Sequence, residues 1–260
     1  MLKGLLSAVG AYKLYKKWLW QQVKNKPLPS HVAVILDGNR RWAKGRRLPP
    51  WFGHREGARK VEDLLDWCLK LGIKTLTLYV LSTENLQRPV EEVNAIFKIA
   101  EEELRRALTD RRIHENGVRV KALGRVELLP EGLRSLIKEL EASTSNYNSH
   151  FLNIAIAYGG RTEIVDAVKK IAESIEGGKL RASDIDEHVI EKHLYTWFLP
   201  NPYPDLIIRT SGEERLSGFL LWQSAYSELV FLDIYWPDFR EIDLLRAIRT
   251  YQTRQRRFGI

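Results

Sequence analysis

Short apolar runs alternate with longer amphipathic segments along most of this chain, and this alternation limits the possible folds more than any other feature. Runs of roughly four to eight apolar residues are typical of buried strands, whereas apolar residues at every third or fourth position indicate helices. A repeated strand–helix–strand order predicts a parallel sheet that is covered by helices. The expected strands are His31–Leu36, Thr75–Leu81, Val118–Leu123, Phe151–Ala157, Leu206–Arg209 and Leu229–Leu232.

The same pattern predicts one α/β domain. The expected helices lie near Glu56–Lys70, Val90–Glu115, Glu131–Ser145, Glu163–Glu176, Asp184–Tyr195 and Asp243–Arg254. A length of 260 residues with 44% hydrophobic residues is enough for one sizeable core. Gly177-Gly178 and Pro200–Pro204 indicate turns rather than linkers. We therefore expect a mostly parallel, six-stranded sheet within residues 27–260, preceded by a basic amphipathic helix in residues 1–26.

The N-terminal segment is basic throughout. From Met1 to Leu36 there are six lysines and no acidic residue. Its apolar residues recur at helical spacing, namely Leu2, Leu5, Leu6, Val9, Tyr12, Tyr15 and Leu19. Two interpretations stay open: a helix lying on an anionic membrane surface, or a helix docked on its own domain or on a dimer partner. The segment is too short and too charged to span a bilayer.

Cysteine content and charge narrow the class of protein further. Cys68 is the single cysteine, so no intrachain disulfide can form, which suits a cytoplasmic protein. A net charge of +8 fits a nucleic acid, a membrane surface or an anionic substrate. A nucleic-acid-binding surface would interleave basic and aromatic residues in one stripe. Here the arginines gather beside carboxylates at expected strand ends, so we expect no nucleic-acid partner.

A polar cluster, Asp37–Trp42, directly follows the first expected strand. Open α/β sheets bind ligands at the carboxyl ends of their strands. Arg40 and Arg41 can bind phosphate oxygens, and Gly38 lets the backbone approach a ligand closely. Asp37 can hold a divalent metal that neutralises the same phosphates. The cluster therefore predicts a diphosphate site with magnesium, and the alternative is a solvated turn.

Polar clusters also follow two other expected strands. Ser82–Pro89 ends the second strand, and Arg209–Gly218 ends the fifth with arginines and glycines that can cradle another diphosphate. His54 stands near an expected helix start, where free N–H groups attract anions. Glu228 is a carboxylate within an apolar, aromatic stretch, and it needs either an arginine or a metal shared with Asp37.

The chain resembles the cis-prenyltransferases, the family of undecaprenyl and dehydrodolichyl diphosphate synthases, from about Pro27 to its C-terminus. The resemblance rests on five ordered blocks: H-V-A-V-I-L-D-G-N-R-R-W-A, S-T-E-N-L-Q-R-P, I-I-R-T-S-G-E-E-R-L-S, L-L-W-Q-S-A-Y-S-E-L and W-P-D-F. It implies magnesium-dependent extension of an allylic diphosphate, of the farnesyl or geranylgeranyl type, by isopentenyl diphosphate. Each new double bond is cis, and the polyprenyl diphosphate serves as a dolichol- or undecaprenol-type carrier lipid. The paired arginines look archaeal or eukaryotic rather than bacterial.

The resemblance also implies roles for individual residues. Asp37 is implied as the essential carboxylate that handles magnesium, and Glu228 as its metal partner. The residues implied for the allylic diphosphate are Gly38, Asn39, Arg40, Arg41, Trp42 and His54. The second block contributes Ser82, Thr83, Glu84, Asn85 and Arg88, with Asn85 the candidate for guiding proton removal. The isopentenyl diphosphate site is implied at Arg209, Arg215, Leu216 and Ser217, and is completed across a homodimer by Arg257 and Gly259.

A product tail needs an apolar tunnel, and an ordinary core is the alternative for its candidate residues. These candidates are Leu64, Leu65, Leu69, Val93, Ile96, Phe97 and Ala100. The chain departs from the family at Pro50, where many bacterial relatives carry an arginine, and Arg46 and Arg47 are the candidates for that charge. Leu86 also replaces a common tryptophan. Some family members are accessory subunits without catalytic residues, but Asp37 and Glu228 are present here, so we expect an active homodimer.

Overall fold

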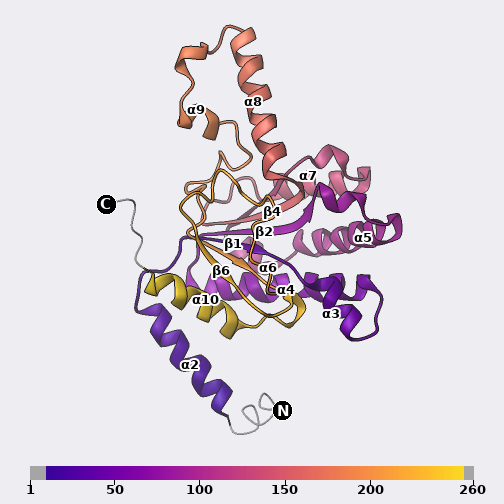
Figure 1. Cartoon of the computed structure of the whole chain (residues 1–260), viewed down its shortest axis with the longest axis vertical. Coiled ribbons are helices and arrows are strands. Elements are labelled where there is room, and N and C mark those ends of the chain that lie inside the picture. Colours follow the sequence, from indigo (N-terminus) through magenta and orange to yellow (C-terminus); the bar gives the residue numbers. More distant parts are fainter. Residues whose placement is uncertain (1–9, 255–260) are drawn as a thin grey trace.

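The computed structural model describes residues 10–254, and its centre is one six-stranded sheet (Figure 1). The strand order is β3-β4-β2-β1-β5-β6, and every neighbouring pair is parallel. The prediction of a six-stranded, mostly parallel α/β sheet is thus confirmed. The strands are β1 (His31–Ile35), β2 (Thr75–Ser82), β3 (Val118–Leu123), β4 (His150–Tyr158), β5 (Leu206–Arg209) and β6 (Glu228–Phe231).

Helices connect these strands, and most lie near their expected positions. The α-helices are α2 (Ala11–Lys24), α3 (Asn39–Gly45), α4 (Pro50–Leu71), α5 (Val90–Ala107), α6 (Arg111–Glu115), α7 (Glu131–Ser143), α8 (Gly160–Glu176), α9 (Glu187–Glu191) and α10 (Glu241–Thr253). Short 3-10 turns are η1 (Glu84–Gln87), η2 (Val126–Leu128), η3 (Ala182–Asp184) and η4 (Trp236–Asp238).

Three of the expected helices differ from the structure. The helix expected over Glu56–Lys70 begins earlier, at Pro50, so His54 lies inside α4 rather than at its start. The single helix expected over Val90–Glu115 is divided into α5 and α6, because the Asp110 side chain accepts a hydrogen bond from the backbone N of Arg112 and so caps a new helix. The helix expected over Asp184–Tyr195 is shorter, since only Glu187–Glu191 is α-helical there.

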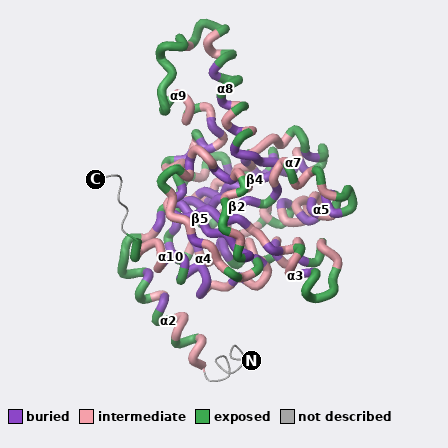
Figure 2. The backbone as a smooth tube through the Cα atoms, viewed as in Figure 1, coloured by how far each residue is buried: buried purple, intermediate pink, exposed green. Residues whose placement is uncertain are grey.

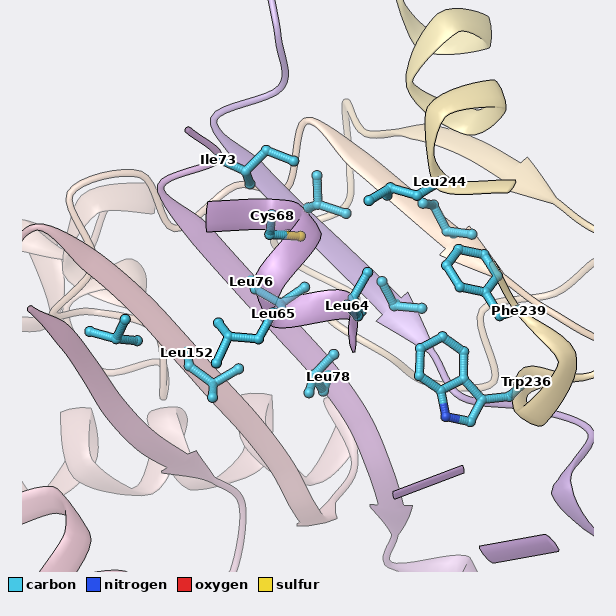
Figure 3. Packing of buried hydrophobic residues seen from close by; sticks show 14 of the residues in the cluster. Leu64, Leu65, Cys68, Ile73, Leu76, Leu78, Leu152, Trp236, Phe239 and Leu244 are labelled. Atoms are coloured by element: carbon cyan, nitrogen blue, oxygen red, sulfur yellow. The ribbon is translucent and has the colours of Figure 1, made fainter. Parts of the chain in front are cut away.

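Alternating strand residues face two separate apolar clusters. Val32 and Val34 of β1 belong to the larger cluster with α4, α5, α7 and α10, whereas Ala33 and Ile35 belong to a smaller one on the opposite face. Figure 3 shows Leu64 of α4 over the strands of the larger cluster, with Trp236 and Phe239 beside it. Both sheet faces are covered, which explains why the strands are continuous apolar runs.

The hairpin of α8 and α9 projects from the body of the molecule (Figure 1). Figure 2 shows that much of this projection is exposed, whereas the sheet is buried. Exposed apolar side chains here include Val168 on α8, which is 55% exposed, and Trp197 in the segment that follows α9, which is 67% exposed. The projection therefore carries apolar surface that its own domain does not cover.

Helix α2 docks on α10 through one face. Leu19 and Val23 are fully buried in the larger cluster, and Trp20 Nε1 donates to Glu241 Oε1 at 2.6 Å. Lys16 Nζ lies 2.8 Å from the same carboxylate. The opposite face remains exposed and includes Leu14, which is 70% exposed. Docking on its own domain therefore accounts for only one face of this helix. The predicted apolar residues Leu2, Leu5, Leu6 and Val9 lie outside the described residues.

None of the helices formed by residues 10–254 is long and apolar enough to cross a bilayer. Of the basic amphipathic helix expected in residues 1–26, the structure describes the 14 residues of α2, which end at Lys24. A bilayer-spanning helix needs about 20 predominantly apolar residues.

A buried polar chain crosses the amino half of the sheet. His31 is fully buried, with Nε2 2.8 Å from Thr77 Oγ1 and Nδ1 3.1 Å from the Asn201 carbonyl oxygen. Asn153 Nδ2 donates to the same threonine at 2.9 Å. Burial lowers the pKa of His31 to about 4, so this imidazole is neutral in the folded protein. Its two ring nitrogens are occupied within the fold.

Candidate functional site

The polar clusters that follow β1, β2 and β5 meet at one edge of the sheet. Strand β1 lies between β2 and β5, and Ile35 is in register with both Tyr79 and Arg209. The chain runs from β1 towards β2 on one side and later returns to β5 on the other, so the strand order reverses at β1. The carboxyl end of such a switch point is where open α/β sheets bind ligands. Asp37 and Arg209 stand at this point.

The Asp37 carboxylate is held by two arginines. Arg209 Nη2 donates to Oδ2 at 2.8 Å, and Arg41 Nη2 donates to Oδ1 at 3.3 Å. Burial favours a higher pKa of the Asp37 carboxyl, but hydrogen bonds from Arg209 and Ser211 and the charges of Arg209 and Arg41 outweigh it. The pKa of Asp37 therefore lies below its ordinary value, and the group is ionised at neutral pH.

Gly38 lets the chain turn sharply behind that carboxylate. Its φ of 102° is in the left-handed region, and its N–H donates to Asp37 Oδ1 at 2.6 Å. A Cβ at this position would lie 2.7 Å from Cδ1 of Tyr235. Glycine is thus required by both the backbone conformation and the space.

Arg209 is almost fully buried yet incompletely satisfied. Its Nη1 donates to Ser217 Oγ at 2.9 Å and to the carbonyl oxygen of Arg215. Its Nε is buried without a hydrogen-bond partner among the residues that the structure describes. Buried donors in native proteins are normally paired, so an orphaned one beside a cavity indicates capacity for a ligand.

Ion pairs continue from this centre towards the surface. Arg41 Nη1 lies 3.0 Å from Glu213 Oε1, and Arg215 Nη1 lies 2.5 Å from Glu213 Oε2. The row Arg215–Glu213–Arg41–Asp37–Arg209 therefore alternates in charge and joins the two predicted diphosphate clusters. No role was predicted for Glu213, because a glutamate in a polar turn gives no signal of its partners.

A cavity of about 660 Å³ opens over these groups. Its wall includes most of the predicted site residues: Asp37, Gly38, Asn39, Arg40, Arg41, His54, Ser82, Asn85, Arg88, Arg209 and Ser217. The structure thus brings together residues from all three predicted clusters. Four cations from the first cluster and its loop line it, namely Arg40, Arg41, Lys44 and Arg47.

Other predicted residues lie nearby but do not line this cavity. The Trp42 indole Nε1 donates to Asp238 Oδ1 at 2.9 Å. The guanidinium carbon of Arg46 lies over the Trp42 ring, 4.0 Å from the ring centroid. Leu216 packs against the smaller apolar cluster. The remaining three, Thr83, Glu84 and Arg215, are also absent from the wall. These five side chains therefore support the site from behind or lie at its rim.

The second block forms a closed turn at the cavity wall. Ser82 Oγ accepts from the backbone N of Asn85 at 3.1 Å, which fixes the start of η1. Thr83 N donates to the carbonyl oxygen of Tyr158 at 3.0 Å and so ties the turn to β4. Asn85 and Ser82 therefore face the cavity from a turn whose backbone is held at both ends.

Of the two candidates for the charge expected near Pro50, Arg47 lines the cavity together with Pro50, and Arg46 does not. Arg46 Nη2 lies 3.2 Å from Asp238 Oδ1 and so points to the η4 side. Arg47 lines the cavity, and neither it nor Lys44 makes a side-chain hydrogen bond or ion pair with any described residue. Arg47 also has a left-handed φ of 59°, which strains a residue with a side chain.

Trp236 of η4 ties the turn after β1 to α4. Its backbone N donates to the Asp37 carbonyl oxygen at 3.0 Å, and its indole Nε1 donates to the Gly57 carbonyl oxygen at 2.7 Å. Gly57 has no room for a side chain, since a Cβ there would lie 2.3 Å from Asn39 Oδ1. The W-P-D-F block therefore positions both Asp37 and Asn39, a role that the sequence analysis did not foresee.

Glu228 is not beside Asp37 within the chain, which corrects the expectation of a shared metal there. Glu228 begins β6 and is in register with Leu206, which is in register with Val32. Asp37 follows Val32 by five residues, or about 16 Å along a parallel strand. Glu228 Oε2 instead accepts from Arg254 Nη1 at 3.0 Å. The arginine alternative therefore holds within this chain, and Arg257 and Gly259 lie outside the described residues.

Asp37 is the only protein carboxylate that faces this cavity among residues 10–254. The same part of the chain contains no group of three or more His, Cys, Asp and Glu side chains that could hold a metal ion. A hard carboxylate oxygen suits Mg²⁺, which protein sites often bind through one or two carboxylates plus substrate phosphates. The donor set therefore fits a magnesium ion that is bound together with a diphosphate.

An apolar cavity of about 180 Å³ adjoins the charged one. Four residues line both, namely Leu36, Asn39, His54 and Val80. Its wall continues between the sheet and α4, α5 and α7 with Leu65, Ile96 and Ala100 among the predicted tunnel residues. Leu64, Leu69, Val93 and Phe97 do not line it, and they pack as core residues or at its margin.

Comparisons with known proteins agree with this geometry. A family model described as "Putative undecaprenyl diphosphate synthase" matches residues 35–259. The tritrans,polycis-undecaprenyl-diphosphate synthase (geranylgeranyl-diphosphate specific) of Pyrococcus abyssi is 53% identical over 266 residues, which cover 100% of both chains. The protein of that name from Methanopyrus kandleri is 54% identical over 248 residues, covering 95% of this chain and 91% of its own.

Solved structures extend the likeness to three dimensions. Lavandulyl diphosphate synthase from Lavandula x intermedia, in complex with dimethylallyl diphosphate, superimposes with a TM-score of 0.87 and 40% identity. A probable undecaprenyl diphosphate synthase from Campylobacter jejuni has a TM-score of 0.72 and 32% identity. Each comparison covers 90% of this chain and 99% of the other.

Proposed function

The chain belongs to the undecaprenyl diphosphate synthase family, and from this premise we propose that it elongates an allylic diphosphate with isopentenyl diphosphate through cis additions. Membership in the cis-prenyltransferase family is thereby confirmed, with archaeal relatives among the most similar proteins. The observation that carries the proposal is the joining of a cation-lined cavity, centred on Asp37 and Arg209, to an apolar one. A prenyl diphosphate has the same two parts.

The proposed reaction proceeds by ionisation, addition and proton loss. The allylic C–O bond breaks, and its electron pair leaves with the diphosphate. The alkene of isopentenyl diphosphate then attacks the allylic carbon and forms the new C–C bond. A proton leaves the adduct to give the new double bond, and the released diphosphate accepts it. Fixed guanidinium groups such as Arg40, Arg41 and Arg88 stabilise the charge that develops on the leaving diphosphate, because they are oriented beforehand.

The two substrates are assigned to opposite sides of Asp37. The allylic diphosphate is assigned to Gly38, Asn39, Arg40, Arg41, His54 and Arg88. Isopentenyl diphosphate is assigned to Arg209 and Ser217, with Arg215 at the rim and Arg257 and Gly259 supplied from outside the described residues. The unpaired Nε of Arg209 supports this second assignment. Asn85 faces the space between them and guides proton removal.

Magnesium is the proposed metal, and Asp37 is the residue that would hold it. When bound, it supplies positive charge that neutralises diphosphate oxygens. Asp37 is ionised at neutral pH because Arg209 and Arg41 depress its pKa below the ordinary value. The protein thus keeps a charged oxygen ligand ready at the switch point.

The apolar cavity is proposed as the start of the tunnel for the growing chain. The two cavities share the wall residues Leu36, Asn39, His54 and Val80, which supports growth of the chain from the charged cavity into the apolar one. We propose geranylgeranyl diphosphate as the primer, because similar proteins are named as specific for it. The product is then a polyprenyl diphosphate for carrier-lipid synthesis.

An active homodimer is proposed as the working form. Exposed apolar side chains near the projecting hairpin and before β6, including Val168, Trp197 and Tyr226, supply surface for self-association. A second copy would also bring a second Glu228 and a second C-terminus, so the metal role implied for Glu228 is testable only in the assembly. Sedimentation analysis distinguishes a dimer from a monomer directly.

We propose that the enzyme is cytoplasmic and contacts the membrane surface peripherally. The contact would be made by the outer face of α2. Leu14 is exposed there beside the exposed lysines Lys13 and Lys17, and Trp18, which is 45% exposed, lies at the margin, where the Arg249 guanidinium of α10 is 5.5 Å from its ring centroid. This combination favours anionic lipid surfaces. Replacing Leu14 and Trp18 with serine should abolish binding to anionic vesicles, whereas replacing Gln21 and Gln22 should not. Retained binding of the first variant would contradict the proposal, and truncation is avoided because Leu19 is buried.

The reaction itself is tested with labelled isopentenyl diphosphate and farnesyl or geranylgeranyl diphosphate, with and without magnesium. Magnesium-dependent polyprenyl products with new cis double bonds are expected, with geranylgeranyl diphosphate the better primer. No extension with either primer by a folded dimer would instead indicate an accessory subunit. The chain length of the product measures how far the apolar cavity reaches.

A further inference from the structure

A single buried carboxylate, that of Glu92, contacts three side chains of the charged cavity. Its side chain is 7% exposed, and it lies in the first turn of α5. Arg88 Nη1 donates to Oε1 at 3.1 Å, and His54 Nε2 lies 3.2 Å from the same oxygen. Arg40 Nε lies 3.5 Å from Oε2. These three groups come from α3, from α4 and from the turn before α5.

Glu92 is well stabilised in this place. A buried carboxylate without partners would carry a large desolvation cost, which two arginines offset here. The N-terminal end of α5 adds a favourable helix dipole. The Glu92 side chain is therefore a well-partnered part of the fold, and its orientation is fixed by these contacts.

Glu92 is the polar partner that orients the side chains of Arg40, His54 and Arg88. Arg40, His54 and Arg88 make no other side-chain hydrogen bond or ion pair with residues 10–254. All three line the cavity of about 660 Å³, whereas Glu92 does not line it. Glu92 thus stands behind them and contacts them from the side away from the ligand space.

We propose that Glu92 is a positioning residue that aims Arg40, His54 and Arg88 at the allylic diphosphate. This inference rests on the proposed function, since the ligand is the one assigned there. Charge-assisted hydrogen bonds hold each partner in one direction, so that little ordering is needed when the diphosphate binds. No role was predicted for Glu92, because Glu91 beside it has the same side chain and the sequence alone does not tell which of the two is buried.

A purely neutralising role for Glu92 makes the opposite prediction. If Glu92 only offset positive charge, its neutral variant would leave a more positive cavity, and anions would bind more tightly. If Glu92 aims the three groups, the same variant loses their orientation, and diphosphate binds more weakly. The direction of the change in affinity therefore separates the two roles.

The test compares Glu92→Gln, Glu92→Asp and the matched control Glu91→Gln, whose site is exposed on the same helix turn. Calorimetric titration with inorganic diphosphate is expected to show about tenfold weaker binding for Glu92→Gln, at the site that geranylgeranyl diphosphate blocks. The KM for the allylic diphosphate should rise by a similar factor, while the KM for isopentenyl diphosphate stays within about twofold. Glu92→Asp should recover part of the loss, and Glu91→Gln should match the unmodified protein.

Unchanged or tighter diphosphate binding by Glu92→Gln would overturn the proposal, as would an equal rise in both KM values. Thermal unfolding of each variant shows whether the fold is retained. Binding of inorganic diphosphate needs no turnover, so this comparison still decides the role of Glu92 if the unmodified protein fails to elongate any primer. That failure would count against the proposed function alone.

Discussion

The two edges of the same sheet carry similar polar residues but use them differently. At the amino edge, Asp205 Oδ2 accepts from Ser30 N, Ser30 Oγ and His31 N at 2.7, 2.8 and 3.0 Å. At the carboxyl edge, Arg209 Nε has no partner, and Lys44 and Arg47 make no side-chain pair with a described residue. The Asp205 carboxylate is thus used within the fold, whereas the unpaired groups at the carboxyl edge line a cavity and keep binding capacity for a ligand. Unsatisfied groups beside a cavity, more than polarity itself, distinguish the site.

The largest expected effect follows from Asp37→Asn at the carboxyl edge. The amide still accepts a hydrogen bond from Arg209, but it loses the charge that holds two arginines and a metal. Turnover should fall by about 10³-fold, the size seen when preorganised electrostatic groups are removed. Turnover per folded molecule, corrected by thermal unfolding, measures this loss. A decrease in turnover of less than tenfold would show that Asp37 is not essential for the reaction.

The second effect is a pH dependence of stability from His31 at the amino edge. The folded pKa of about 4 lies below the unfolded value of 6.5, so the unfolded chain binds a proton first as the pH falls. The stabilisation is complete above pH 6.5 and is lost towards pH 4, by about 3 kcal/mol in total. Denaturant unfolding of the protein and of His31→Gln between pH 7 and pH 4 measures it. Equal pH slopes for the two would contradict the assignment to His31.

Asp205→Asn is the amino-edge counterpart of the Asp37 variant. It weakens three hydrogen bonds from Ser30 and His31, so stability should fall by about 2 kcal/mol. Turnover per folded molecule should stay within about twofold. Urea unfolding and steady-state rates check the two halves of this prediction separately. A large loss of turnover without a loss of stability would show that the two edges are not functionally distinct.

The smallest effect separates Arg47 from Arg46. Arg47→Gln should raise the KM for the allylic diphosphate by about tenfold, because its side chain lines the cavity without a partner. Arg46→Gln should leave that KM nearly unchanged, since Arg46 is engaged with Trp42 and Asp238. Initial rates at varied allylic diphosphate supply both values. The reverse order of effects would assign the replacement charge to Arg46.

The sheet could be predicted from the sequence because both of its faces are covered. Strands such as His31–Ile35 are buried throughout, and continuous apolar runs indicate this directly. The clustering of Asp37, Ser82 and Arg209 followed, since the carboxyl ends of parallel strands share an edge. The break at Asp110 was missed because no proline or glycine marks it, and a side-chain cap ends the long helix there.

The partner of Glu228 was predictable in part. Glu228 precedes its expected strand, whereas Asp37 follows its own, and such residues lie at opposite edges of a parallel sheet. That signal was present in the sequence and excluded a shared metal within one chain. The identity of Arg254 was not predictable, because a contact 26 residues away leaves no local pattern. Glu92 and Glu213 were missed for the same reason, since burial and cross-chain pairing decide their roles.

The alternating row from Arg215 to Arg209 has a consequence for selectivity among the anions of the cell. Before any ligand arrives, Glu213 and Asp37 already act as resident counter-ions for its arginines. A stray monovalent anion must compete with these carboxylates and gains little by replacing one of them. A diphosphate offers several charged oxygens at once and can engage more than one arginine. The arginines of this row are thereby protected from abundant small anions and stay available for ligands of high charge.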